Sequence, residues 1–119
     1  MQFRNRRLIK TEDLNPRGTL FGGKLLMWID EEAAIYAHCQ LQTPYIVTKY
    51  ISEINFVSPA HPGAIIEIGM EKTGVGFTSI TMKCEVRNKA TKQTIISIDQ
   101  IVFVSVDENG KPKPHGKTK

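Results

Sequence analysis

The sequence Asn15-Pro16-Arg17-Gly18-Thr19-Leu20-Phe21-Gly22-Gly23 leads directly into an apolar helix pattern that extends from Gly22 to about Gln40. Backbone N–H groups at the start of a helix have no partner within the helix and carry a partial positive charge. Glycine has no side chain, so the Gly22-Gly23 pair lets a ligand come close to these groups. We therefore predict that the helix start binds an anion, or a carbonyl oxygen that gains negative charge during a reaction.

Asp30, two turns further along this helix, is the second unusual feature. At helical spacing it shares a row with Gly23, Met27 and Ala34, none of which is charged. One interpretation is a solvated acid on a surface helix, the ordinary position for an aspartate. The other is a desolvated carboxylate suited to act as a general base or nucleophile. Spacing alone does not choose between the two.

The remainder of the helix pattern predicts which face is buried. Glu31 and Glu32 are expected to be solvated, or to pair with Lys24 and nearby basic groups. The apolar stripe expected to face the core consists of Gly22, Leu26, Ile29, Ala33 and Ala37.

Five other segments are predicted to be strands. The clearest of them alternate between apolar and polar residues, and the last is apolar on both faces. Short connections between the later segments predict antiparallel hairpins, and hence an α+β architecture with the helix on one face of the sheet. Residues 1–106 form the predicted domain. The segment from 107 to 119 is polar and basic with two prolines, and is predicted to be a mobile tail. The expected strands are 2–9, 45–57, 64–72, 79–88 and 94–106.

Composition limits the class of protein. The chain has 119 residues, a length that suits one domain, and a net charge of +4. No apolar run is long enough to span a membrane, and residues 1–10 contain no apolar signal segment. Cys39 and Cys84 do not form a disulfide framework, which predicts a cytoplasmic location. No nucleic-acid-binding motif is present, so we expect no nucleic-acid partner and no membrane partner.

Three motifs together resemble the acyl-CoA hydrolase group of the hotdog-fold thioesterases: Asn15-x-x-Gly18-x-x-Phe21-Gly22-Gly23, Asp30, and Gly76-x-Thr78-Ser79-Ile80. The resemblance covers nearly the whole chain up to about Val106. It implies a five-stranded antiparallel sheet wrapped around one long helix. It also implies a homodimer, assembled further into a tetramer or hexamer, with active sites at the dimer interface. The implied reaction is hydrolysis of an acyl-CoA thioester to a free acid and CoA.

The resemblance also implies roles for individual residues. Asp30 corresponds to the catalytic acid, acting as general base or as nucleophile, and Asn15 to the catalytic loop amide. Gly22 and Gly23 supply the helix-start amides that bind the carbonyl oxygen. No metal and no separate cofactor are required, because CoA is part of the substrate and product. The segment expected to lie against the coenzyme contains Gly76, Thr78 and Ser79.

Two positions depart from the family pattern. Gly63-Ala64 stands where many relatives have Gly-Asp, and Phe77 stands where many have Arg. The missing arginine leaves the family's phosphate contact at that point unassigned. The sequence does not choose among the candidate replacements, which are Arg17, Lys49 and the lysines of the tail.

The spacing of Gly22 and Asp30 gives an argument for a dimer that does not depend on the family. The two residues are eight positions apart, which is about 12 Å along a helix. A single thioester carbonyl cannot contact both groups of one chain. If both act on one substrate, they come from different chains, as an isologous dimer with antiparallel helices would allow.

Other functions fit the residues less well. A non-catalytic acyl-CoA-binding module of the same fold remains an alternative. A hotdog dehydratase would need a histidine before the helix, and residues 11–21 contain none. No strand–turn–helix elbow presents a serine nucleophile. His38, His61 and His115 do not have the spacing of metal ligands.

Overall fold

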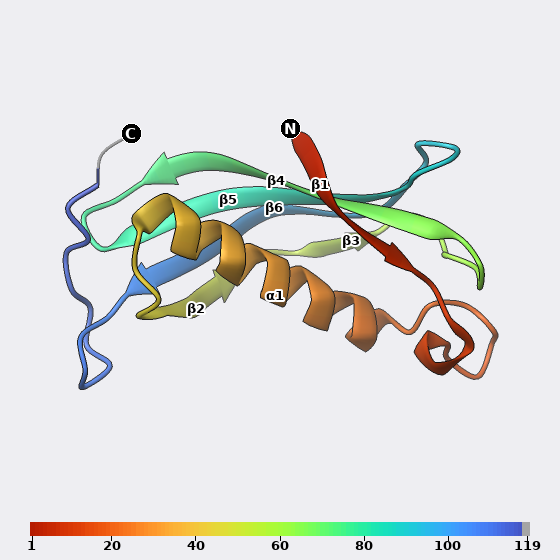
Figure 1. The fold of residues 1–119 in the computed structure, drawn as a ribbon, viewed down its shortest axis with the longest axis horizontal. Coiled ribbons are helices and arrows are strands. Elements are labelled where there is room, and N and C mark those ends of the chain that lie inside the picture. Colours follow the sequence, from red (N-terminus) through yellow and green to blue (C-terminus); the bar gives the residue numbers. More distant parts are fainter. Residues whose placement is uncertain (118–119) are drawn as a thin grey trace.

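One long helix lies across one face of an antiparallel sheet in the computed structural model, which describes residues 1–117 (Figure 1). The sheet order is β1-β4-β5-β6-β2, and β3 pairs separately with β6. The elements in chain order are β1 (Gln2–Leu8), the short 3₁₀ helix η1 (Thr11–Asp13), α1 (Gly22–Leu41), β2 (Ile46–Ile51), β3 (Ile54–Phe56), β4 (Ile65–Val75), β5 (Ser79–Asn88) and β6 (Thr94–Ser105).

The predicted α+β class and the antiparallel hairpins are confirmed, but the sheet has six strands rather than five. The strand expected at 45–57 is interrupted at Ser52 and Glu53. Ser52 donates its backbone N–H to the Gln100 carbonyl at 2.9 Å, and its Oγ accepts the Gln100 N–H at 3.0 Å. These bonds replace the regular ladder at this point, so β2 pairs with residues 101–105 of β6 and β3 with residues 96–98.

The buried face of α1 is rotated relative to the stripe expected from the sequence. Ile29, Ala33 and Ala37 are buried as predicted, whereas Leu26 is only partly buried. The alanines have no exposed surface, and their small side chains let the helix lie close to the sheet. Leu25, Trp28 and Leu41 are buried as well. β1 covers the helix at Trp28, where the Arg7 guanidinium lies 5.2 Å from the centre of the ring.

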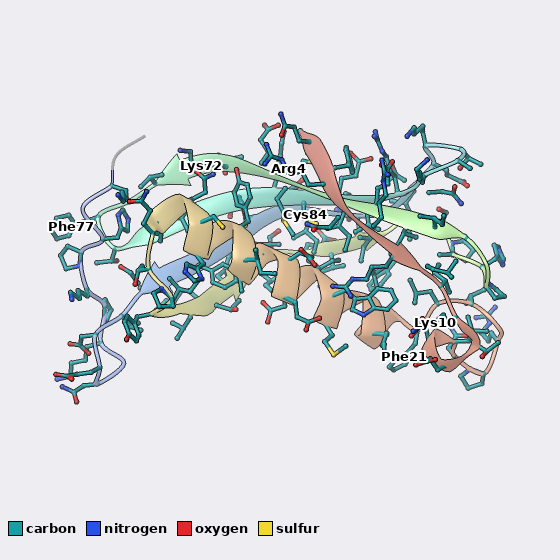
Figure 2. All side chains as sticks on the ribbon, viewed as in Figure 1. Arg4, Lys10, Phe21, Lys72, Phe77 and Cys84 are labelled. Atoms are coloured by element: carbon teal, nitrogen blue, oxygen red, sulfur yellow. The ribbon has the colours of Figure 1, made fainter. Side chains whose placement is uncertain are left out.

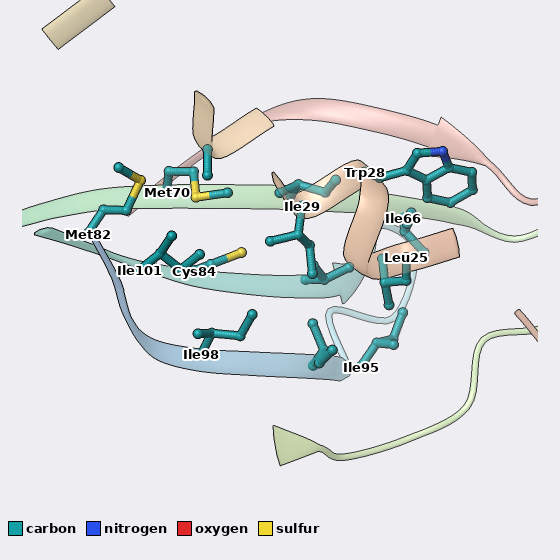
Figure 3. Packing of buried hydrophobic residues seen from close by; sticks show 14 of the residues in the cluster. Leu25, Trp28, Ile29, Ile66, Met70, Met82, Cys84, Ile95, Ile98 and Ile101 are labelled. Atoms are coloured by element: carbon teal, nitrogen blue, oxygen red, sulfur yellow. The ribbon is translucent and has the colours of Figure 1, made fainter. Parts of the chain in front are cut away.

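The core lies between this helix face and the inner face of the sheet (Figure 3). Alternate residues of β4 and β5 point toward the helix, as their sequence pattern predicts. β6 also contributes buried side chains to the core. Its pairing with β5 shifts by one residue near Ile95, and this bulge turns Ile95 inward together with Ile96. The buried residues of β4 and β5 are Ile66, Ile68, Met70, Ile80, Met82, Cys84 and Val86.

Glu32 follows one of its two expectations, a pair with a nearby basic group, since it is buried rather than solvated. Its Oε1 accepts a hydrogen bond from Arg7 Nη2 at 2.9 Å. Lys24, the partner expected from helical spacing, instead lies 3.5 Å from the buried carboxylate of Asp13. Both pairings connect the helix to residues before it in the chain, which helical spacing does not predict.

The C-terminal segment as far as residue 117 folds back beside the start of β5. Lys113 donates its backbone N–H to Ser105 O at 2.8 Å, and His115 Nε2 lies 3.0 Å from Ser79 O. The predicted mobility of this tail stays a prediction, and its last two residues lie outside the described part of the chain.

A charged cluster stands on the outer face of the sheet, around Glu67 of β4. The Glu67 side chain is only 4% exposed, and its carboxylate accepts from Lys92 at 3.1 Å, Arg87 at 3.2 Å and Arg6 at 3.4 Å. The Lys92 ammonium, followed by the Arg87 guanidinium, holds the pKa of Glu67 below its usual range. The ionised carboxylate therefore stabilises the fold.

We predict that Glu67→Gln lowers the melting temperature at pH 7, and that the difference from wild type narrows in acid. A carboxyl whose pKa is lowered on folding stabilises the protein above its unfolded pKa. This stabilisation is lost as the pH falls from the unfolded value of 4.5 through the lower folded pKa. Thermal melts from pH 7 to pH 3 measure it. Glu53→Gln, in the exposed bend after β2, is the control, and its melting temperature should stay close to that of wild type at every pH. A difference between Glu67→Gln and wild type that stays the same size from pH 7 to pH 3 would contradict the prediction.

Candidate active site

The loop before α1 forms a small closed turn around Asn15. Asn15 N donates to Thr19 O at 2.8 Å, and Gly18 N donates to Asn15 O at 3.0 Å. The order Asn15-Pro16-Arg17-Gly18 suits a β-turn, with proline second and glycine last. The Asn15 side chain holds the turn: Oδ1 accepts the N–H groups of Arg17 and Thr19, and Nδ2 donates to Thr19 Oγ1 at 3.0 Å. An amide nitrogen carries two N–H groups, so one can still donate to a ligand.

The start of α1 has no capping side chain. Phe21 occupies the N-cap position without a side-chain hydrogen bond, and the first turn contains no acid. Phe21 N donates to Asp13 O at 2.9 Å, which fixes the helix start against η1. A Cβ atom at Gly22 would lie 3.4 Å from the Phe56 ring, and one at Gly23 would lie 2.8 Å from the Phe21 ring. A side chain at either position would therefore meet an aromatic ring, most closely at Gly23.

Asn15 and Gly22 line the same groove, which has a volume of about 340 Å³. The groove lies between the helix start and the segment from Phe56 to Ala60, and most of its walls are apolar. The structure therefore brings together two of the residues expected to act on the substrate. The other lining residues are Leu20, Leu25, Phe56, Val57, Ser58, Pro59, Ala60 and Ile95.

Asp30 is exposed in the single chain, as expected for a solvated acid on a surface helix. Its Oδ1 accepts a hydrogen bond from Thr48 Oγ1 of β2 at 2.9 Å. Thr48 was not among the predicted site residues, because nothing in the sequence distinguishes it from the chain's other threonines and its partner is 18 residues away in another element.

Gly76, Thr78 and Ser79 lie in the turn between β4 and β5. Gly76 N donates to Ser79 O at 3.0 Å, and Thr78 O accepts the backbone N–H of Ser105 at 2.8 Å. Phe77, at the tip, is 78% exposed. Figure 2 shows Phe77 and Phe21 near opposite ends of the long axis, so one chain does not bring this turn to its own helix start.

The described residues offer no other obvious centre for chemistry. Within residues 1–117, no group of three histidine, cysteine or acidic side chains could hold a metal ion. Burial raises the pKa of the Cys84 thiol to about 12, so this sulfur acts in packing and not as a nucleophile. No described helix is long and apolar enough to cross a membrane.

Comparison with known proteins agrees with the fold. Residues 17–95 match the family model of the thioesterase superfamily. The chain belongs to this superfamily. The uncharacterised acyl-CoA thioester hydrolase YkhA of Bacillus subtilis is 33% identical over 86% of the chain, and the chain spans 60% of its length.

The solved structures that resemble this chain include thioesterases. The hexameric thioesterase y2039 of Yersinia pestis is 28% identical with a TM-score of 0.86, covering 95% of this chain and 93% of its own. The acyl-CoA hydrolase of Staphylococcus aureus, solved in complex with butyryl-CoA, CoA and CoA disulfide, is 28% identical with a TM-score of 0.82. The match covers 92% of this chain and 66% of the Staphylococcus chain. It has also been solved with an aspartate-to-alanine and with a threonine-to-alanine substitution.

Proposed function

We propose that this member of the superfamily hydrolyses acyl-CoA thioesters to a carboxylic acid and CoA. The observation that carries the proposal is the uncapped helix start, where Gly22 lines a groove together with Asn15. An assay of free thiol released from acyl-CoA tests it. Tight binding without thiol release would favour the non-catalytic binding module instead.

The helix start is suited to the developing charge. When a nucleophile attacks the thioester carbon, the carbonyl oxygen becomes negative, and fixed N–H groups stabilise it. The amides of Gly22 and Gly23 would donate to this oxygen, with the helix dipole in support. Asn15 would orient the carbonyl or the attacking water through its amide. None of these groups needs to change its charge during the reaction.

Asp30 would generate the nucleophile. In one route it takes a proton from water, whose oxygen attacks the thioester carbon; the C–S bond then breaks and the CoA sulfur receives the proton. In the other route Asp30 attacks directly, expelling the CoA thiolate, and water hydrolyses the mixed anhydride. The Thr48 hydrogen bond to Oδ1 would fix the carboxylate and leave Oδ2 free to react.

A homodimer would assemble these groups. Gly22 and Asp30 are about 12 Å apart along α1, so we assign the helix start to one chain and Asp30 to its partner. β2 is an edge strand, and exposed apolar side chains lie on it and on the neighbouring elements. Their burial against a second copy would favour association. We propose further assembly into a hexamer, as in the Yersinia protein. The exposed apolar residues are Met27, Val47, Tyr50, Phe56 and Val57.

The coenzyme portion of the substrate would lie against Gly76, Thr78 and Ser79. This turn lies at the end of the molecule where α1 ends, because Lys117, two residues beyond His115, reaches Gln42. An antiparallel partner would direct its helix start toward this half of α1, so one substrate could reach both. Cys39 and Cys84 are free, which supports a reducing, cytoplasmic setting for the enzyme.

We predict that Asp30→Asn lowers kcat for thioester hydrolysis by at least about a hundredfold, the usual scale for a positioned acid–base group. The neighbouring variant Glu31→Gln removes an exposed carboxylate from the same helix and should keep wild-type activity. Thiol release and the oligomeric state are measured for both. Near wild-type turnover in Asp30→Asn would refute the catalytic assignment.

Thr48→Val should lower kcat about tenfold with little change in KM, because one hydrogen bond to a charged group is lost. Valine keeps the shape of threonine, so a defect reports the lost hydroxyl. Thr48→Ser, which restores the donor, should recover most of the activity. Equal activity in the valine and serine variants would show that Thr48 does not position Asp30.

A mixing experiment tests the shared site. Inactive Asp30→Ala and inactive Gly23→Val are combined and allowed to exchange subunits. Each mixed dimer then has one site with both defects and one with neither, so activity should reappear at up to about half of wild type per mixed dimer. Asn15→Ala can replace Gly23→Val, because Asn15 lines the groove at the helix start. Confirmed exchange without recovered activity would contradict the shared site.

A further inference from the structure

We propose that the groove beneath the start of α1 binds the acyl chain of the substrate, and that Ala60 and Ile95 limit the chain length. This inference rests on the proposed function and deepens it. It assigns the acyl chain to the groove lined by Asn15, Gly22 and their apolar neighbours.

The groove has a buried apolar floor and a more exposed rim. Leu20, Leu25, Ala60 and Ile95 are each at most 8% exposed and form the floor. Phe56 and Val57 are about 60% exposed in the single chain and stand at the rim, on the surface assigned above to the dimer contact; the Phe56 ring lies close to Gly22. An acyl chain entering past the rim would leave water and contact mainly hydrocarbon. Each methylene buried in this way strengthens binding about fourfold.

The position of the groove follows from the chemistry of the thioester. Its carbonyl oxygen is assigned to the amides of Gly22 and Gly23, so the acyl carbons must begin within a bond or two of Gly22. Gly22 itself lines the groove, and Asn15 lines it from the opposite loop. The acyl chain can therefore enter the apolar floor directly, while the sulfur and the pantetheine arm extend the other way toward the partner chain.

A second cleft, of about 450 Å³, lies between β1, α1 and β4, but it is poorly placed. Its helical residues Ile35, Tyr36 and Cys39 point about 120–180° away from Asp30 around α1, and Ile35 is about 20 Å along the axis from Gly22. It also contains the charged groups of Arg4, Glu32 and Glu71, whose desolvation an alkyl chain would not compensate. This cleft contacts none of the residues assigned to the thioester.

Two substitutions change the floor in opposite directions. Ala60→Leu should fill the groove and lower the ratio of kcat/KM for octanoyl-CoA to that for acetyl-CoA by at least about tenfold, as expected for two or more lost methylene contacts. Ile95→Ala should enlarge the groove and raise the same ratio. Ile98→Ala is the matched control, since Ile98 is a buried isoleucine of the same strand outside the groove, and should leave the ratio unchanged. The ratio of the two kcat/KM values does not depend on the fraction of protein that is folded, because both values scale with the concentration of active enzyme.

For each protein, kcat/KM is measured with acetyl-, butyryl-, hexanoyl-, octanoyl- and palmitoyl-CoA. Opposite shifts in Ala60→Leu and Ile95→Ala, with none in Ile98→Ala, support the assignment. Hydrolysis with unchanged ratios in both floor variants overturns the assignment alone. No hydrolysis of any substrate by the wild type overturns the proposed function, and the acyl-chain assignment with it.

A direct measurement on the wild-type protein covers the case in which both floor variants fail to fold. A non-hydrolysable octanoyl-CoA thioether with a diazirine at the end of its alkyl chain is bound and photolysed, and the labelled peptide is identified by mass spectrometry. Labelling within residues 56–60, or at Ile95 and its neighbours, supports the assignment. Labelling within residues 35–40 or 68–71 places the chain in the second cleft and overturns it.

Discussion

A helix is a rigid spacer, and the length of α1 between Gly22 and Asp30 constrains the whole molecule. The uncapped N–H groups at one position and the carboxylate at the other stay about 12 Å apart whatever the side chains do. The chain cannot complete the proposed site by bending its loop, because Phe21 is bonded to Asp13 and the helix starts immediately afterwards. The single chain therefore presents two half-sites on one scaffold, and the exposed edge at β2 provides a surface on which a second copy can supply the missing halves.

The surrounding structure keeps this scaffold fixed. The Arg7–Glu32 pair joins β1 to the middle of α1, and the Lys24–Asp13 pair joins the first turn of α1 to η1. Together these contacts hold the helix on the side away from Asp30. On the opposite side β2 packs against the helix, and Thr48 of this strand donates a side-chain hydrogen bond to Asp30. The helix is thus held on both sides, and the outer edge of β2 stays open where the proposed chemistry would take place.

The sequence predicted the features that depend on local rules. The helix start at the glycine pair and the alternating strands β4 and β5 follow from backbone preferences and periodicity. The break at Ser52 was not predictable, because it arises from two bonds to Gln100, on a strand far along the chain. The Arg7 partner of Glu32 and the contact made by Thr48 were not predictable for the same reason: each depends on a partner in another element. The site residues Asp30, Gly22 and Asn15 were identified by motif, but only the folded chain shows that the last two share a groove.

The two alanines at the centre of α1 have a role beyond packing. Ala33 and Ala37 are fully buried, so their methyl groups set the separation between the helix and the sheet. The Thr48–Asp30 bond crosses that same separation one turn away. A gain in core volume that lifts the helix would therefore lengthen this bond. Under the proposed mechanism, core volume and reactivity would be coupled through one distance, and a genetic screen for inactive but folded variants would collect changes at buried positions that never touch substrate.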